Sequence, residues 1–182
     1  MTTNDVLFVQ RLKRRKTVVD KLRRTHEDRT GLISDATSMQ DTAGCRLIFN
    51  DNQALLEFRE QFRQDLGKRS INHHLKHDPK NFNYIENPKP SGYRGIHDIL
   101  VHKPRPHRRD DRTNLAWHGL VAEIQYRTKV QNSWATALEM TDLINNTRTK
   151  FDLKRNQRFD FFSLISELLA GKYEGLKKVI ST

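Results

Sequence analysis

The stretch VAEIQYRT, residues 121–128, constrains the fold more than any other part of the sequence. Its β-branched and aromatic residues predict a β-strand, in which successive side chains point to opposite faces. Glu123, Gln125 and Arg127 therefore share one face with Val121, and apolar residues alternate with them on the other. A strand with such a face fits either a solvent-exposed sheet surface or a site built from a carboxylate, an amide and a guanidinium.

The rest of the sequence mixes strand-like and helix-like segments. Short apolar runs, and apolar residues at spacings of three and four, predict strands at 45–49, 93–102 and 119–128 and helices at 52–67, 129–144 and 159–173. Segment 11–24 also has an apolar side and predicts one or two helical turns. This mixture indicates an α+β fold, a mixed β-sheet flanked by helices, with a main domain at 1–150 and a C-terminal helical extension at 151–182.

The positive charge of the chain points to an anionic partner. The formal net charge is +11, and basic residues concentrate in segments 11–24 and 102–112. Such a balance suits nucleic acid, a nucleotide or another phosphate-rich substrate, although solvated lysines and arginines would give the same composition. Position within the fold has to decide between these readings.

The compartment follows from what the sequence contains. No apolar run is long enough to cross a bilayer, and the N-terminal residues show no apolar stretch of signal-peptide length. Cys45 is the only cysteine, which excludes an internal disulfide, and its apolar surroundings suit a small core residue better than a nucleophile. We therefore expect a cytoplasmic protein without a membrane partner.

Two carboxylates are candidates for a metal site. Asp41 stands just before the apolar strand 45–49, where it could hold Mg²⁺ or merely begin a turn. Glu123 lies in the middle of a strand, where a carboxylate is costly to bury unless it is paired or bound to a cation. If the two lie on neighbouring strands, their charges together would favour a cation between them.

Two further segments carry groups suited to phosphates and bases. In 84–97, Lys89, Arg94 and His97 could meet phosphates and Tyr93 could offer a flat face to a nucleobase, but an ordinary Pro/Gly loop fits equally. In the basic segment, polyphosphate could be held by four residues: Arg11, Lys13, Thr17 and Lys21. A solvated basic helix is the alternative there.

Other site chemistries find less support. The residues His73, His74 and His77 lack a nearby cysteine and fit a surface loop better than a zinc site. The sequence contains neither the G-x-x-x-x-G-K-[ST] phosphate loop nor the G-x-G-x-x-G dinucleotide motif.

Taken in order, four segments resemble the synthetase domain of the RelA/SpoT family, which makes the alarmones (p)ppGpp. The first is R-x-K with a threonine four residues on and then K-L, from Arg11 to Leu22. The second is D-x-A-G-x-R, from Asp41 to Arg46, and the third is Y-I-x-x-P-K-x-x-G-Y-R-x-x-H, residues 84–97. The fourth is E-I-Q-x-R-T at 123–128, followed by a W-A helix.

The resemblance implies a nucleotidyltransferase-like synthetase fold and a role for each matching residue. Arg11 and Arg46 would sandwich the adenine of ATP, and its phosphates would meet Lys13, Thr17 and Lys21. Asp41 and Glu123 would bind Mg²⁺, with Glu123 also the candidate base. The acceptor would meet Lys89, Tyr93 and His97, while Arg94, Gln125 and Arg127 would support the site.

The implied reaction moves the β,γ-pyrophosphate of ATP to a ribose 3′-hydroxyl and releases AMP. The acceptor could be GDP or GTP, an adenine nucleotide, or the 3′ end of tRNA, which the basic segment 102–112 would suit. A non-catalytic nucleotide- or RNA-binding module is a further alternative. With neither a hydrolase domain nor regulatory domains in the sequence, the resemblance implies a small stand-alone synthetase. The apolar helix at 159–173 could form a homo-oligomer contact or cap the chain's own core.

Overall fold

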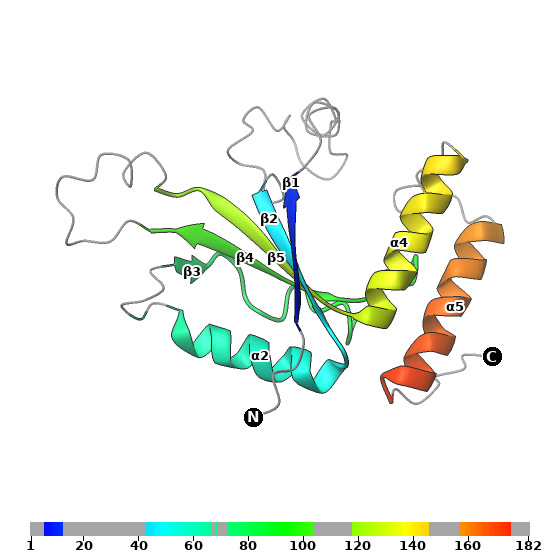
Figure 1. The fold of residues 1–182 in the computed structure, drawn as a ribbon, viewed down its shortest axis with the longest axis horizontal. Coiled ribbons are helices and arrows are strands. Elements are labelled where there is room, and N and C mark those ends of the chain that lie inside the picture. Colours follow the sequence, from blue (N-terminus) through cyan, green and yellow to red (C-terminus); the bar gives the residue numbers. More distant parts are fainter. Residues whose placement is uncertain are drawn as a thin grey trace.

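A five-stranded mixed sheet forms the centre of the protein, in a computed structural model that describes residues 6–12, 43–66, 68, 73–103, 118–145 and 157–175. The elements are β1 (Leu7–Leu12), β2 (Ala43–Phe49), α2 (Asn52–Asp65), β3 (His73–Leu75), β4 (Ile96–His102), β5 (Val121–Thr128), α4 (Lys129–Ile144) and α5 (Gln157–Tyr173). The strand order is β1-β2-β5-β4-β3, with β2 and β5 parallel and the other neighbours antiparallel. Figure 1 shows α2 on one side of the sheet and α4 beside α5 at one end. The predicted α+β class is confirmed.

Two segments differ from their predicted structure. Residues 7–12 form an edge strand that pairs in antiparallel register with β2, so the first two residues of segment 11–24, for which helical turns were predicted, are extended. Pairing with β2 supplies the backbone hydrogen bonds that a helix would otherwise provide. Residues 13–24 lie outside the described part of the chain. The histidine segment predicted as a loop contains β3, which pairs with the end of β4.

One face of the sheet packs on α2. This helix begins where the side chain of Asp51 accepts a hydrogen bond from the Ala54 amide at 2.8 Å. Its buried residues join the first core cluster, which comprises Phe49, Ala54, Leu55, Ile85, Ile96 and Tyr126. Tyr126 of β5 belongs to this cluster. Glu123, Gln125 and Arg127, which alternate with it along the strand, therefore face away from α2, on the other side of the sheet.

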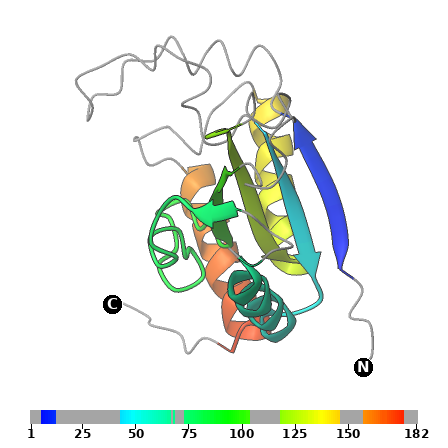
Figure 2. The same ribbon diagram turned by 90° about the vertical axis from the view of Figure 1, so that its left-hand side faces the viewer.

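The second core cluster joins α4 to α5. Strand β5 runs directly into α4 through a capping box between Thr128 and Gln131, which fixes the direction of the helix. The cluster comprises Tyr93, Trp134, Ala135, Leu138 and Phe162, so α5 caps the chain's own core. Figure 2 shows α4 and α5 from a second direction. An oligomer contact through α5 stays a prediction, and none of the described helices is long and apolar enough to cross a membrane.

Candidate active site

The polar face of β5 is the centre of the candidate site. The backbone register places Gln125 between Arg46 of β2 and His97 of β4. Gln125 is 4% exposed and Arg127 2% exposed, so these two residues are not part of a solvated sheet surface. The interpretation of VAEIQYRT as a solvent-exposed sheet surface is therefore wrong for these two residues. A buried polar face requires hydrogen-bond partners.

Together with Glu123, those partners form a closed ring of hydrogen bonds, named below the ring around Glu123. Its members are Tyr93, His97, Glu123, Gln125 and Arg127. Gln125 Nε2 donates to one carboxylate oxygen at 2.8 Å, and His97 Nδ1 lies 2.8 Å from the other. On its far side, His97 Nε2 lies 2.6 Å from the Tyr93 hydroxyl. Arg127 closes the ring by donating to that hydroxyl at 3.2 and 3.1 Å and to Gln125 Oε1 at 3.2 Å. Neither Gln125 nor Arg127 had a definite role in the sequence, and here they complete the ring.

The ring assigns the protonation state of His97. A phenolic oxygen has two lone pairs and one hydrogen, and both N–H contacts from Arg127 use the lone pairs of Tyr93. The Tyr93 hydrogen is therefore donated to His97 Nε2, which leaves the imidazole neutral with its proton on Nδ1, donated to Glu123. Burial lowers the pKa of His97 and outweighs the opposing effect of Glu123, which agrees with a neutral ring.

Gln125 and His97 thus each direct a hydrogen bond to an oxygen of Glu123, whose side chain is still partly exposed. Its side chain is 14% exposed, so a ligand can reach the carboxylate. Carboxylate oxygens can each accept more than one contact, whether from a hydroxyl or from a cation. The arrangement is that of a carboxylate held in place and able to take a proton or to bind Mg²⁺.

Arg46 borders the ring on the β2 side. Its Nε and Nη2 lie 3.4 Å from Gln125 Oε1, and its Nη1 donates to Asn132 of α4 at 3.1 Å. Arg11 occupies the register position opposite Gly44, which in turn pairs with Glu123. The backbone therefore places Arg46 on the strand next to β5 and Arg11 on β1, one strand further out.

Gly44 is needed for the close approach of β2 to Glu123. A Cβ atom on Gly44 would lie 2.6 Å from the backbone oxygen of Glu123, closer than real contacts allow. The glycine of the D-x-A-G-x-R motif therefore lets β2 and β5 lie close together beside Glu123.

We expect Gly44→Ala to lower the free energy of unfolding by about 1–3 kcal/mol, because the strands must separate to admit the methyl group. Urea denaturation followed by circular dichroism measures this change. Gly171→Ala, on the exposed surface of α5, is the matched control and should be neutral or slightly stabilising. Equal effects at the two positions would contradict the close-approach explanation.

The loop before β4 brings Lys89 and Tyr93 together with Tyr84. The Lys89 ammonium lies 4.5 Å from the Tyr84 ring centroid and 5.5 Å from that of Tyr93. Tyr93 is only 4% exposed, so a base could stack on it only after Lys89 or a neighbouring side chain moves. Tyr84, half-buried and edge-on to His97, is an aromatic group that the sequence reasoning missed.

Arg94 does not point toward a phosphate site, which was one of two readings of its segment. Its guanidinium bonds the Ile85 carbonyl at 3.1 Å and Ser166 of α5 at 3.3 Å. Because Arg94 and Tyr93 are consecutive residues of one loop, they can serve different sides of it. The supporting role of Arg94 is therefore directed at α5.

Several predicted residues fall outside the described part of the chain: Lys13, Thr17, Lys21 and Asp41. The pairing of Asp41 with Glu123 therefore stays a prediction. Among the residues that the structure describes, no group of three or more His, Cys, Asp or Glu side chains could hold a metal. Asn132, the partner of Arg46, was also missed, although its place in the first turn after β5 could have indicated it.

Solved structures share this fold. The small alarmone synthetase 1 from Bacillus subtilis, bound to its product pppGpp, is 20% identical with a TM-score of 0.68, covering 93% of this chain and 75% of that one. The small alarmone synthetase 2 from Bacillus subtilis is 23% identical, with a TM-score of 0.65 and coverages of 93% and 77%. A GTP pyrophosphokinase family protein from Streptococcus pneumoniae is 18% identical, with a TM-score of 0.63 and coverages of 96% and 74%.

At these identities the structural likeness establishes a common fold. None of the curated proteins compared with the sequence matches it. The sequence itself, however, matches the pattern of the region found in RelA / SpoT proteins over residues 10–143. That match includes the sheet except for the first three residues of β1, and it includes all members of the ring around Glu123. The chain therefore belongs to the RelA/SpoT family.

Proposed function

We propose that the protein is an ATP-dependent pyrophosphokinase that transfers the β,γ-pyrophosphate of ATP to the 3′-hydroxyl of GDP or GTP. The products are AMP and (p)ppGpp. The observation that carries the proposal is the ring of hydrogen bonds that orients Glu123 in a chain of this family. The structurally similar synthetase with bound pppGpp supports a guanine nucleotide as the acceptor.

The proposed reaction needs a base and an aligned nucleophile. The 3′-oxygen attacks the β-phosphorus of ATP, and the bond from that phosphorus to the oxygen bridging it to the α-phosphate breaks, so that AMP leaves. Glu123 accepts the proton of the 3′-hydroxyl. His97 and Gln125 each donate to one of its oxygens, so the carboxylate is held in place before substrate arrives.

The chemistry of Glu123 also fits Mg²⁺, because its accessible carboxylate supplies the hard oxygen ligands that this ion prefers. A bound Mg²⁺ would neutralise charge on the transferred phosphates. Asp41 is the proposed second ligand. ATP would meet the remaining residues of the resemblance: Arg11 and Arg46 at the base, and Lys13, Thr17 and Lys21 at the phosphates. Lys89 and His97 are proposed to meet the acceptor.

The test is transfer of label from ATP in the presence of Mg²⁺ to GDP, GTP, ADP or deacylated tRNA. Label on GDP or GTP, lost when Mg²⁺ is chelated, is the expected result. Label on tRNA or ADP alone would overturn the choice of acceptor and favour the corresponding relative. Transfer to none of them by folded protein would overturn the enzyme assignment and favour a binding module.

A second measurement separates two roles of Tyr93. In Tyr93→Phe the ring remains, but the hydroxyl that links Arg127 to His97 is lost. We expect kcat to fall by about 10–100-fold, as for other groups that orient a ligand or base, with the KM for acceptor nearly unchanged. An unchanged kcat would show that only the aromatic ring of Tyr93 matters and that its hydroxyl does not.

A further inference from the structure

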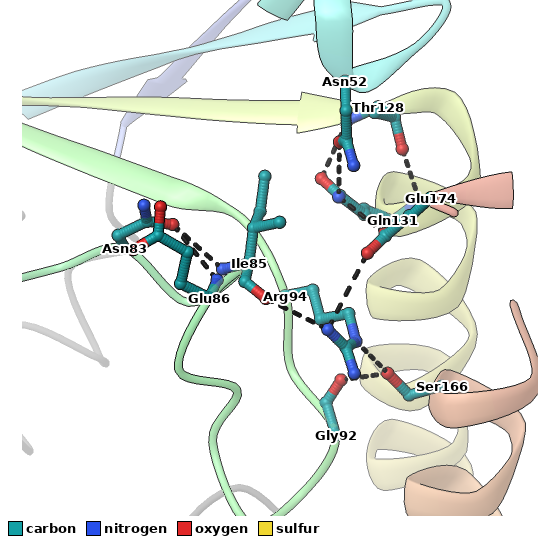
Figure 3. A network of polar contacts seen from close by, with 10 residues as sticks. All are labelled: Asn52, Asn83, Ile85, Glu86, Gly92, Arg94, Thr128, Gln131, Ser166 and Glu174. Carbon is teal, nitrogen blue, oxygen red and sulfur yellow. Dashed lines mark hydrogen bonds and ion pairs between the residues drawn. The ribbon is translucent and has the colours of Figure 1, made fainter. Parts of the chain in front are cut away.

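A second buried polar network lies behind the loop that carries Tyr93. It connects the loop to α5, to the first turn of α4 and to the first residue of α2 (Figure 3). Its members come from segments far apart in the sequence: Asn52, Ile85, Gly92, Arg94, Gln131, Ser166 and Glu174. None of them belongs to the ring around Glu123.

Arg94 is the centre of this network. Its Nη1 lies 3.7 Å from Glu174 Oε2, in addition to its bonds to Ile85 and Ser166. The side chains of Arg94 and Glu174 are 12% and 4% exposed, so the ion pair is largely shielded from water. Gln131 donates to the other oxygen of Glu174 at 2.7 Å.

Ser166 holds the residue on the other side of Tyr93. Its hydroxyl donates a short hydrogen bond to the Gly92 carbonyl. Gly92 has a φ of 85°, and a Cβ atom there would lie 2.8 Å from Ser166 Cβ. Glycine at this position therefore allows both the left-handed backbone and the close contact with α5.

The aromatic ring of Tyr93 lies between Gly92, which Ser166 holds, and Arg94, which Ser166 and Glu174 hold. It packs in the second core cluster with Trp134 and Phe162, and the Trp134 indole donates to the Phe162 carbonyl at 2.9 Å. The loop thus contacts α5 through Gly92, Tyr93 and Arg94 in succession. On the opposite side of the loop, the Tyr93 hydroxyl contacts His97, which in turn contacts Glu123.

We propose that Arg94, Ser166 and Glu174 are positioning residues, which fix the Tyr93 loop to α5 so that the hydroxyl of Tyr93 stays in register with His97 and Glu123. Helix α5 is then a working part of the acceptor side of the site. The catalytic consequence rests on the proposed function, whereas the effect on the loop does not.

The loop can be tested without substrates. In Glu174→Gln the charge opposite Arg94 is lost, while Gln131 keeps an oxygen to bond. Hydrogen exchange should become about tenfold faster for the amides of 84–95. Their reporting bonds in the native protein are Tyr84 to Gly95, Lys89 to Tyr93 and Gly92 to Lys89. Exchange in β2 and β5 should not change.

Glu167→Gln is the matched control, because it makes the same change on the exposed side of α5. Ser166→Ala is the second variant, needed if Glu174→Gln does not fold. Arg94→Lys should retain part of the wild-type protection, because it keeps the positive charge but replaces the branched guanidinium by a single ammonium group. If exchange in 84–95 stays at the wild-type rate in both Glu174→Gln and Ser166→Ala, the proposal is overturned.

Kinetics supply the readout that general destabilisation would not give. Below the melting temperature of each variant, Glu174→Gln should lower kcat, as loss of the Tyr93 hydroxyl does. It should also raise the KM for the acceptor about fivefold or more, because the same loop carries Lys89, and leave the KM for ATP within about twofold. A faster-exchanging loop with unchanged kinetic constants, or an equal rise in both KM values, would overturn the positioning role. A wild-type protein without transferase activity would refute the proposed function, and the exchange data would still decide whether α5 fixes the loop.

Discussion

Replacing Glu123 by glutamine is expected to lower kcat by about 10²- to 10⁴-fold, the usual contribution of a positioned general base. The amide has nearly the same shape, but it cannot accept the proton of a 3′-hydroxyl. It also turns an N–H toward one of the two donors that surround Glu123, His97 or Gln125, and so opens the ring. Binding of ATP should be largely preserved, because the proposed adenine and phosphate contacts lie on other residues.

The measurement is single-turnover transfer of labelled pyrophosphate, with ATP affinity determined separately by calorimetry. Glu139→Gln, on the exposed side of α4, is the control for a lost carboxylate elsewhere and should retain full activity. An active Glu123→Gln enzyme would remove Glu123 from the role of base. A variant that loses ATP binding and activity together would indicate that Glu123 mainly holds the nucleotide with its metal.

The sequence predicted the centre of the site better than its surroundings. The two-residue period of VAEIQYRT was enough to place Glu123, Gln125 and Arg127 on one face, because a strand's pleat depends on local geometry alone. The contacts of Arg127 depend on which strands lie beside β5 and in what register. Those partners come from distant segments, so its bond to Tyr93 could not be read from local spacing.

The wrong expectations have a related cause. Segment 11–24 has an apolar side that predicts helical turns, yet its first two residues belong to a strand whose pairing with β2 decides their structure, which shows tertiary context overriding a short pattern. Arg94 stands next to Tyr93 in a motif rich in phosphate-binding groups, but the loop turns its guanidinium toward α5. Only the fold shows that neighbouring residues of this loop serve opposite sides.

A buried ion pair on the face of the sheet that packs against α2 should make a large contribution to the free energy of unfolding. Asp98 of β4 accepts two hydrogen bonds from Arg59 of α2, at 3.0 and 2.7 Å, and Arg59 also donates to the Pro79 carbonyl at 2.9 Å. The two side chains are 1% and 8% exposed. Burial, with the Asp98 charge as a further cause, raises the pKa of the adjacent Tyr126 hydroxyl, which indicates that this region is poorly solvated.

Asp98→Ala is therefore expected to lower the free energy of unfolding by about 3–5 kcal/mol, because it leaves the Arg59 guanidinium buried without its counter-charge. That is a large part of the roughly 5–15 kcal/mol that stabilises a typical domain, so the midpoint of urea denaturation should fall markedly. Asp65→Ala, which breaks the exposed ion pair with Lys68, should leave the midpoint almost unchanged.

The double variant Arg59→Met/Asp98→Leu separates the value of the pair from the cost of an orphaned charge. With both charges gone, no buried ion needs a partner, and apolar side chains can pack between α2 and β4. We expect the double variant to be more stable than Asp98→Ala, since replacing both members of a buried pair is often neutral. A double variant as unstable as Asp98→Ala would show instead that the pair's own hydrogen bonds, including that to Pro79, hold α2 on the sheet.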